Sequence, residues 1–503
     1  MNRQPRRWDE RSNPISDIAR GANPHSEVTE LNLEGALTVA LFTADLVAIG
    51  WVVTRKRSPA SALAWTVTIL FLPLVGLAAF LIFGRNRLPR RLRRQIAHSA
   101  LFAERLEVDR LLSEPTEATD PGWEGLSRLA RELGASPVRG GNEVIHLHTG
   151  AVAGAAFLRA IEEARHHVHV EEYIFRNDDA GREILEAMIR RAAQGVEVRL
   201  LVDAIGTPAA HSLFRRLQRV GGRGAVFLPL FPFGKTLSPN LRLHRKIIVV
   251  DGKVGFLGGM NIGDEYLGRG LPSRYWRDQH LELRGPAALD LQHIFVQDWD
   301  LATGELLAGA QYFPPVRPAG HSRVQLLGAG PEQHRNAIRR LLFAAITRAR
   351  HRIRVSSPYL LPDTGLEDAL CVAALRGVQV ELLTQGRPPE TWLTWFGSRY
   401  HWEELLSSGV RIWQYRPGIL HAKSMIVDDA VACIGSPNMD NRSLRLNFEV
   451  LGLLGSDVDV LEASRRFDAD LRQAEEVDLA TFLRRPAWQR PLEVGARLLE
   501  PLL

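Results

Sequence analysis

Two stretches of the sequence carry the same polar residues at the same spacing. Residues 243–261 read LHRKIIVVDGKVGFLGGMN, and residues 420–438 read LHAKSMIVDDAVACIGSPN. Both follow the pattern L-H-x-K-x4-D-x6-G-x2-N, and their histidines, His244 and His421, are 177 positions apart. The chain holds only five lysines and 16 histidines, so two histidine–lysine pairs at one spacing are not a consequence of composition.

A histidine and a lysine two residues apart, present twice, could carry out substitution at a phosphodiester. Imidazole is a nucleophile and also a proton carrier near neutral pH. An ammonium group beside it neutralises a phosphate oxygen. If two such pairs faced one phosphate, one histidine could attack phosphorus while the other protonated the leaving alcohol and then activated an incoming one. A single copy would be half of such a site, and alone it would be interpreted as incidental polar residues at a strand end.

Each copy needs a rigid element to hold its pair, and the surrounding residues predict strands. Residues 247–250 and 424–427 are apolar runs typical of buried strands. Asp251 and Asp428 follow these runs in turn-forming sequences, and the apolar residues after them predict a returning strand. We expect each histidine and lysine to lie in a strand-like segment and so to leave the same face of it.

The repetition extends well beyond this motif. ARHHVHVEEYIF begins at Ala164 and ARHRIRVSSPYLL begins at Ala349, an offset of 185. GVEVRLLVD and GVQVELLTQ recur farther along at an offset of 182. Strand-like and helix-like periods alternate in both regions, which is typical of α/β folds. We therefore predict two homologous α/β halves, residues 126–300 and 301–503, with one active site where they meet.

Two apolar runs precede these halves. Residues 36–54 and 61–83 are joined by only six residues, RKRSPA. At about 1.5 Å per residue, each run could cross about 30 Å of hydrocarbon as a helix. We predict a transmembrane hairpin over residues 36–83, the alternative being a pair of buried helices. The flanking segments are predicted as a polar N-terminal tail (1–35) and a basic connector (84–125).

The charge of the chain indicates an anionic partner. The formal net charge is +6, which favours either nucleic acid or an acidic membrane surface. The segment RNRLPRRLRRQ after the second apolar run carries six arginines. Positive charge on this side favours a cytoplasmic catalytic part and could bind anionic lipid headgroups. The two cysteines, Cys371 and Cys433, cannot form a disulfide framework and suggest no zinc site.

These features resemble the phospholipase D superfamily, whose signature is H-x-K-x4-D-x6-G-[GS]-x-N in duplicate. More closely, the chain resembles bacterial cardiolipin synthases over about residues 36–503, in stretches such as VEEYIFRND, WRDQHLEL, SPYLLPD and IGSPNMDNRSLRLNFE. The resemblance implies two phospholipase D-like halves in a multi-pass protein of the bacterial inner membrane. It implies transfer of a phosphatidyl group between two phosphatidylglycerol molecules through a phosphatidyl-histidine intermediate. No cofactor, metal or nucleic-acid partner is expected.

The resemblance also implies roles for individual residues. His244 is expected to be the nucleophile and His421 the general acid and base. The remaining expected site residues are the motif lysines and aspartates, a phosphate-binding set and two histidine-orienting acids: Lys246, Lys423, Asp251 and Asp428; Asn261, Asn438 and Ser436; Asp278 and Glu449. Which acid orients which histidine is left open. Because Asp251 and Asp428 follow four apolar strand residues, a structural role at the turn is expected for them. Gly259 stands where the second copy has Ser436, so the two halves are unequal.

Four other functions compete with cardiolipin synthesis, and one of them is that of another phosphatidyl transferase of the same superfamily. A hydrolase of the same superfamily would pass the intermediate to water, and a phosphodiesterase would act on nucleic acid. An inactive membrane scaffold is disfavoured because both histidine–lysine pairs are complete. Further histidines could suggest a metal site, but no spacing of carboxylates or cysteines supports one, so we expect exposed or edge-strand positions for them: His146, His148, His166, His167 and His169.

Overall fold

The computed structural model describes residues 24–55, 59–84, 121–229, 240–269, 276–331 and 336–500. The chain divides into two units, residues 1–85 and residues 86–503, and each is described by itself. Most of the predicted polar tail (1–35) lies outside the described residues, and so does nearly all of the predicted basic connector (84–125).

The described part of the N-terminal unit contains three helices, α1 (Pro24–Arg55), α2 (Pro59–Phe71) and α3 (Pro73–Phe83). The second apolar run was expected to form one helix, but it is divided between α2 and α3. The break falls at Leu72 because Pro73 has no N–H to donate and its ring clashes with the preceding turn. Proline is instead tolerated at the first position of the new helix.

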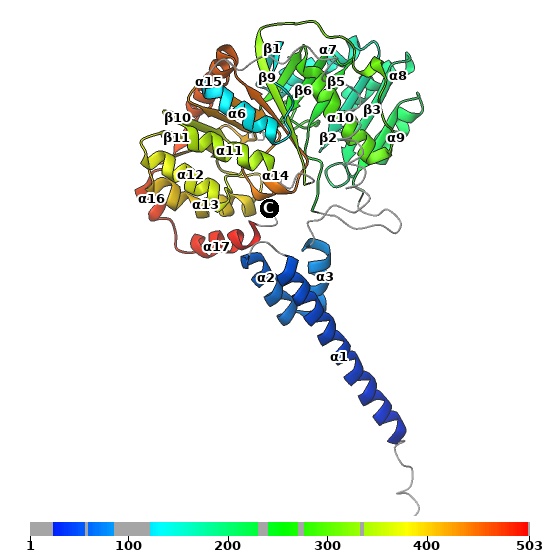
Figure 1. Ribbon diagram of the computed structural model, residues 1–503, viewed down its shortest axis with the longest axis vertical. Helices are drawn as coiled ribbons and strands as arrows, with labels where there is room; N and C mark the ends of the chain where they lie inside the picture. Colours follow the sequence, from blue (N-terminus) through cyan, green and yellow to red (C-terminus); the bar gives the residue numbers. More distant parts are fainter. Residues whose placement is uncertain are drawn as a thin grey trace, which may run out of the picture. The chain divides into compact units, whose positions relative to one another are not determined.

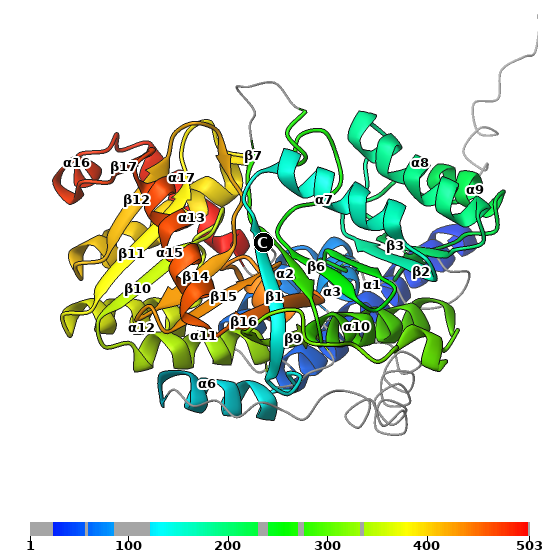
Figure 2. The ribbon, with the colours of Figure 1, turned by 90° about the horizontal axis from the view of Figure 1, so that it is seen from above.

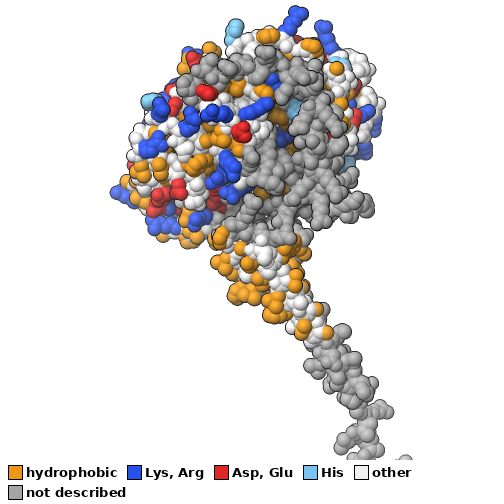
Figure 3. Space-filling model, viewed as in Figure 1, with side chains coloured by type: hydrophobic (Ala, Val, Ile, Leu, Met, Phe, Trp, Pro, Cys, Tyr) orange, Lys and Arg blue, Asp and Glu red, His pale blue; other side chains and the backbone are white. Residues whose placement is uncertain are grey.

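The three helices pack on a small apolar core and leave many apolar side chains outside it. Val52 and Ile69 are fully buried, and the ring of Phe80 meets Trp51 edge to face at 5.7 Å between ring centroids. On the face drawn in Figure 3, the described surface of α1–α3 is mainly hydrophobic. Within the described residues, no helix has both the length and the apolarity required to cross a membrane. The transmembrane hairpin therefore stays a prediction.

The C-terminal unit is built on one continuous sheet of 15 strands in the order β17-β12-β11-β10-β14-β15-β16-β9-β1-β8-β6-β5-β2-β3-β4. The first half contributes β1 (Arg139–Leu147), β2 (His167–Glu172), β3 (Glu197–Asp203), β4 (Arg223–Phe227), β5 (Ile247–Val250), β6 (Val254–Gly258) and β8 (His280–Arg284). The second half contributes β9 (Ser322–Ala329), β10 (Arg352–Ser356), β11 (Gln379–Gln385), β12 (Arg411–Tyr415), β14 (Ser424–Val427), β15 (Val431–Gly435), β16 (Glu449–Leu454) and β17 (Ala474–Glu476).

The sheet repeats itself about its centre, where β1 pairs antiparallel with β9 (Figure 2). Moving outward, β8, β6, β5, β2, β3 and β4 correspond in order to β16, β15, β14, β10, β11 and β12. In both halves the motif strand is antiparallel to its neighbours, and the next three strands outward run parallel to one another. In the second half β17 follows as an antiparallel edge strand. The predicted α/β fold with two homologous halves is confirmed.

Helices cover both faces of this sheet (Figures 1 and 2). In the first half α7 (Gly150–Glu163), α8 (Asp179–Ala193) and α9 (Ala210–Gln218) pack on one face, and α10 (Ala287–Thr303) packs on the other. In the second half α6 (Pro121–Glu132), α11 (Ala337–Arg348), α12 (Thr364–Leu375) and α13 (Trp392–Ser407) pack on one face, opposite α15 (Asp457–Leu471). Among the residues that the structure describes, this unit also contains α14 (Asn441–Arg445), α16 (Leu479–Leu483) and α17 (Gln489–Leu499). One apolar core joins α10 and α15, so the halves share a single interior.

The histidines of β2 are not where the sequence suggested. His167 and His169 are fully buried, because β2 lies between β5 and β3 inside the sheet and is not an edge strand. The His169 ring stacks on Phe295 with centroids 4.4 Å apart, and its Nδ1 lies 3.0 Å from Oε1 of Gln292. No group of three or more histidine, cysteine or acidic side chains in the described part of the chain is arranged to hold a metal ion.

Candidate active site

The first motif reaches the site just before its strand begins. His244 and Lys246 were expected in a strand-like segment, but β5 starts only at Ile247. Instead, Leu243 forms an isolated parallel bridge with Phe448 of the second half. The N–H of His244 donates to the carbonyl of Phe448 at 2.9 Å, and the N–H of Phe448 donates to the carbonyl of Arg242 at 2.8 Å. The backbone before the motif strand is therefore attached to the opposite half.

The second motif is held in the same way. The short strand β13 (Ile419–Leu420) pairs in parallel with β7 (Trp276–Arg277) of the first half. The N–H of His421 then donates to the carbonyl of Arg277 at 2.7 Å. Each catalytic candidate is thus anchored by backbone of the other half, and the pair can come together only where the halves meet.

Each histidine is also oriented by an acid that belongs to the opposite half. Nδ1 of His244 lies 2.9 Å from Oε2 of Glu449, and Nδ1 of His421 lies 2.5 Å from Oδ2 of Asp278. Both carboxylates are fully buried. The sequence left this assignment open, and the structure pairs each histidine with the acid of the opposite half. Because Nδ1 is occupied in both rings, Nε2 is the nitrogen left for a substrate.

The two lysines brace the motif backbone. Nζ of Lys246 donates to the carbonyl of His244 at 2.7 Å, and Nζ of Lys423 donates to the carbonyl of His421. Lys423 also lies 3.9 Å from Oδ2 of Asp278. Burial lowers the pKa of both lysines, that of Lys423 to about 8, although nearby carboxylates oppose the shift. An ammonium keeps three donors, so each lysine has N–H groups left for a phosphate oxygen.

The charges favour neutral imidazoles beside ionised carboxylates. Burial lowers the pKa of His244 to about 4, against the opposing effect of Glu449. Burial and Lys423 also lower the pKa of His421. Burial opposes ionisation of the two acids, but the cationic and imidazole neighbours outweigh it, so the pKa values of Asp278 and Glu449 lie below their usual range. At neutral pH each histidine therefore offers an unprotonated Nε2, as a nucleophile or base requires.

Both histidines open into one pocket of about 260 Å³ between the halves. Its lining includes Asn261 and Asn438, the predicted phosphate ligands. It also contains residues to which the sequence assigned no role: Tyr173, Arg242, Tyr266, Tyr359, Glu390, Asp440 and Arg442. Tyr173, Tyr359 and Arg442 lie within EEYIF, SPYLL and NRSLRLNFE, which are stretches that resemble cardiolipin synthases. Their place in these stretches is a signal by which the sequence could have identified them. Glu390 lies in no such stretch.

Comparison with known proteins agrees with this geometry. Residues 157–299 and 342–471, which contain both motifs, match the family model described as cardiolipin synthase, PLD-like domain. The chain belongs to the cardiolipin synthase family. It is 38% identical over 476 residues to a cardiolipin synthase of Alkalihalophilus pseudofirmus, covering 93% of this chain and 94% of the relative. It is 39% identical over 470 residues to a cardiolipin synthase of Geobacillus thermodenitrificans, covering 92% of this chain and 93% of the relative.

A second family model, described as phospholipase D-nuclease N-terminal, matches residues 43–85. Among solved structures, phosphatidylserine synthase from Haemophilus influenzae aligns with 75% of this chain and all of its own, with a TM-score of 0.58 and 15% identity. That likeness concerns the fold alone. The resemblance to cardiolipin synthases expected from the motifs is confirmed.

Ser436 and Gly259 distinguish the two halves of this family member at matched positions. The Ser436 hydroxyl donates to Oε2 of Glu449 at 2.5 Å and accepts from the N–H of Val450 at 3.0 Å. It therefore holds the acid, and the expected contact of Ser436 with the phosphate stays a prediction. At Gly259 a Cβ atom would lie 2.2 Å from Oδ1 of Asp278. The glycine leaves room for this carboxylate, whose Oδ1 accepts from the N–H of Gln279 at 2.7 Å instead.

The signature aspartates lie at the other end of the motif strands. Asp251 is five residues beyond Lys246, which places it about 16 Å away along an extended strand. Each aspartate has a positive φ, 53° for Asp251 and 52° for Asp428. Each carboxylate accepts three backbone N–H groups at 2.7–2.9 Å, from Arg165, His166 and His167 or from Arg350, His351 and Arg352. These contacts are those of a turn anchor that ties the motif strand to its neighbour.

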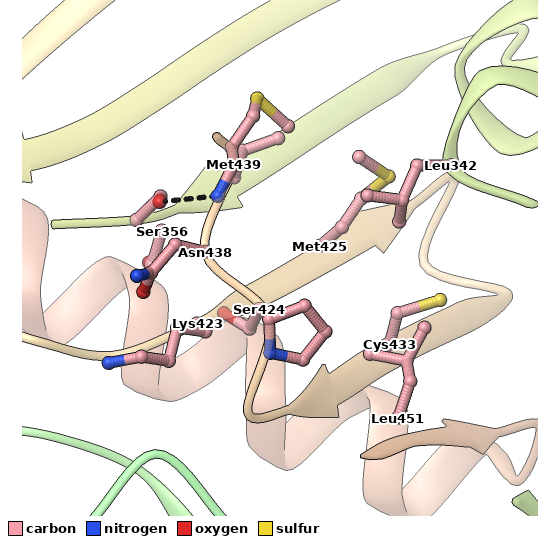
Figure 4. A pocket seen from close by; sticks show the side chains of 12 residues that line it. Leu342, Ser356, Lys423, Ser424, Met425, Cys433, Asn438, Met439 and Leu451 are labelled. Carbon is pink, nitrogen blue, oxygen red and sulfur yellow. Dashed lines mark hydrogen bonds between the residues drawn. The ribbon is translucent and has the colours of Figure 1, made fainter. Parts of the chain in front are cut away.

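A second, smaller pocket of about 30 Å³ lies beside the second motif (Figure 4). Figure 4 shows the polar ends of Lys423 and Asn438 directed to one side, away from Met425 and Cys433. The N–H of Met439 donates to the Ser357 hydroxyl at 3.0 Å, which ties the segment after the motif to the end of β10. This hydrogen bond supports the segment that carries Asn438 into the site.

Proposed function

We propose that this enzyme transfers a phosphatidyl group from one phosphatidylglycerol to the hydroxyl of a second, forming cardiolipin and releasing glycerol. The observation that carries the proposal is the pair of histidines in one pocket, each oriented through Nδ1 by an acid of the opposite half. Such a pair provides a nucleophile and a separate acid and base for one phosphodiester.

In the first step Nε2 of His244 attacks phosphorus. A P–N bond forms, and the bond between phosphorus and the glycerol oxygen breaks. The negative charge of the bound phosphodiester raises the pKa of His421, which takes up a proton from solvent when the substrate binds and then gives it to the departing oxygen. Glu449 stabilises the positive charge that develops on the His244 ring. Lys246 and Lys423, with Asn261 and Asn438, neutralise and bind the phosphate oxygens.

In the second step a hydroxyl of another phosphatidylglycerol takes the place of the departed glycerol. His421, now neutral, removes the proton of this hydroxyl as its oxygen attacks phosphorus. The P–N bond breaks, and His244 is regenerated as a neutral imidazole. Two phosphatidylglycerol molecules thus become one cardiolipin and one glycerol, and each histidine ends in its starting protonation state.

We propose that residues 36–83 hold the enzyme in the bacterial inner membrane as a multi-pass hairpin, with the catalytic unit in the cytoplasm. The two apolar runs and the exposed apolar side chains of α1–α3 support this placement, because large exposed apolar surfaces mark membrane or protein contacts. The arginines of residues 85–94 would lie near anionic headgroups.

The test uses the purified full-length enzyme and vesicles of headgroup-labelled and acyl-labelled phosphatidylglycerol. We expect cardiolipin and free glycerol in equal amounts, separated and counted by chromatography. His244→Ala is the matched inactive control. Phosphatidic acid as the only lipid product would overturn the proposal and would indicate a hydrolase.

A further inference from the structure

The pocket is unequal on its two sides. The ring of Tyr173 lies beside His244, with centroids 5.1 Å apart. Arg242 and Arg442 also line the pocket, and both act electrostatically on Tyr173. Beside His421 lie the rings of Trp276 and Tyr266, with centroids 5.0 Å and 6.0 Å from the imidazole. Of these two rings, Tyr266 lines the pocket, so the wall near His421 is aromatic and differs in chemistry from the basic wall near Tyr173 and His244.

One carboxylate belongs to this aromatic side. Glu390 lines the pocket from the loop before α13 and is exposed to solvent. The hydroxyl of Tyr359 donates to its Oε2, and its backbone N–H donates to Oε1 of Gln385 at 2.9 Å. Glu390 also acts electrostatically on His421 and Lys423, opposing the lowering of their pKa values by burial, so it lies within reach of the reacting region.

Glu390 has no role in the proposed reaction at phosphorus. An ionised glutamate is only a hydrogen-bond acceptor, and it repels a phosphodiester. Tyr359 supplies one donor, and any further partner of the carboxylate in the pocket must also be a donor. Hydroxyl groups are the donors of a glycerol headgroup. A carboxylate beside aromatic rings suits a polyol, since the rings pack against its carbons while the carboxylate accepts from its hydroxyls.

We propose that Glu390, held by Tyr359, binds the glycerol part of phosphatidylglycerol on the His421 side of the pocket. This inference rests on the proposed function, in which the leaving glycerol and the incoming hydroxyl both occupy that side. The carboxylate accepts a hydrogen bond from the hydroxyl adjacent to the one that reacts. It therefore selects vicinal diols over water and monohydric alcohols as acceptors of the phosphatidyl group.

The experiment measures how the phosphatidyl-enzyme intermediate is divided between two acceptor alcohols, glycerol and 1-propanol. Full-length enzyme in phosphatidylglycerol vesicles receives radiolabelled glycerol and 1-propanol together at fixed concentrations. The ratio of labelled phosphatidylglycerol to phosphatidylpropanol is then measured. Because both products come from the same intermediate, the ratio does not depend on how much of a variant is folded.

For Glu390→Ala we expect this ratio to fall roughly tenfold to a hundredfold, as for loss of a hydrogen bond to a charged group. Glu390→Gln keeps an acceptor oxygen, so its ratio should fall less, and Tyr359→Phe should lie between this variant and the wild type. If Glu390→Ala gives too little product to measure, a fall in the ratio for Glu390→Gln supports the inference, and an unchanged ratio overturns it.

Glu403→Ala is the matched control, because Glu403 is a glutamate of α13 that pairs with Arg485 and does not line the pocket. Its ratio should equal that of the wild type. An unchanged ratio in Glu390→Ala, with cardiolipin still formed by the wild type, would overturn this inference alone. Absence of both cardiolipin and glycerol exchange in the wild type would overturn the proposed function and this inference with it.

Discussion

At the scale of single residues, the two motif histidines differ in their surroundings. His244 lies near a ring of Tyr173 and a basic wall, and His421 lies near aromatic rings and Glu390. An anionic phosphodiester favours the basic wall, and a glycerol favours the other. This asymmetry agrees with attack by His244 and proton transfer by His421.

A trapping experiment tests these roles. Full-length enzyme is mixed with acyl-labelled phosphatidylglycerol and quenched with denaturant at alkaline pH, which preserves phosphoramidates. We expect no protein-bound label in His244→Ala, because no nucleophile remains. His421→Ala should accumulate label slowly, because it lacks the acid that protonates the leaving glycerol. The label should persist, because the variant also lacks the base that activates the incoming hydroxyl.

The comparison includes Glu449→Gln, in which the imidazole of His244 loses its charged partner. Its labelling rate should fall by a factor of about a hundred or more, because the ring is no longer held in the reactive tautomer. Label in His244→Ala together with its absence in His421→Ala would exchange the two roles.

At the scale of elements, the motif strands are anchored at both ends by different means. Before the strand, backbone pairing with the opposite half positions the histidine. After it, Asp251 or Asp428 accepts three backbone N–H groups from the segment that leads into the neighbouring strand. The identical spacing between lysine and aspartate in the two copies is thus the length of one strand, and we predict a structural role for the aspartate.

Asp428→Asn should therefore reduce stability and leave catalysis nearly intact. The amide loses the charge and half of the acceptor capacity, so we expect a loss of about 2–4 kcal/mol in the free energy of unfolding. Denaturant titration followed by tryptophan fluorescence would measure this loss. Specific activity per folded molecule should stay within about threefold of the wild type, since the carboxylate is about 16 Å from the lysine.

Asp429→Asn provides the control at the adjacent position. Its side chain is largely exposed and bonds Arg352 and Ser464 rather than backbone amides. Asparagine also tolerates the positive φ shared by both residues, so backbone strain does not differ between the variants. A specific activity of Asp428→Asn reduced a hundredfold would contradict the structural role.

At the scale of the whole molecule, the C-terminal unit, which is the catalytic unit, contains many buried, neutral histidines. Burial lowers the pKa to about 4 for His146, His167 and His244 and to about 3 for His148 and His280. His401 is the exception, because Glu367 and Glu500 overcome burial and raise its pKa to about 9. The unit therefore includes several groups that take up protons more readily when unfolded.

The stability of the catalytic unit should fall as the pH is lowered. A histidine with a pKa of about 4 in the folded state and 6.5 in the unfolded state contributes fully above pH 6.5. Its contribution, on the order of 3 kcal/mol, is lost between pH 6.5 and 4. Burial raises the pKa values of Glu171, Glu172 and Asp203, and these acids act in the opposite direction over part of this range. We therefore expect a net loss of stability that is smaller than the sum of the histidine contributions. Circular dichroism of the full-length enzyme between pH 8 and pH 3.5 would follow it.

His280→Phe serves as an internal control for this explanation. The buried His280 ring meets Phe157 edge to face at 5.2 Å, so a phenyl ring replaces it with similar packing. The slope of unfolding free energy against pH, between pH 4 and 6, should decrease by about one proton relative to the wild type. Stability that does not change between pH 6.5 and 4.5 would refute the role of the buried histidines.

The sequence by itself determined the α/β class, the duplication and the four basic residues of the site. These follow from local patterns: periods of two and 3.6 residues reveal strands and helices, and a repeated phrase reveals equivalent positions. The sequence predicted the strands at 247–250 and 424–427 correctly. It also predicted that the histidine and lysine of each motif lie in these strands, which is wrong, because their spacing does not show where the segment leaves the sheet to pair with the opposite half.

Only the tertiary structure decided which acid serves which histidine. Glu449 is 205 positions from His244, and Asp278 is 143 positions from His421. Those contacts depend on how the two halves pack along a shared sheet, which no local period encodes. Within the second half, the folding of the chain placed Ser436 against Glu449 and brought Tyr359 and Glu390 to the side of His421. The two motifs indicated the chemistry of the site, and contacts between residues far apart in the chain make its two sides different.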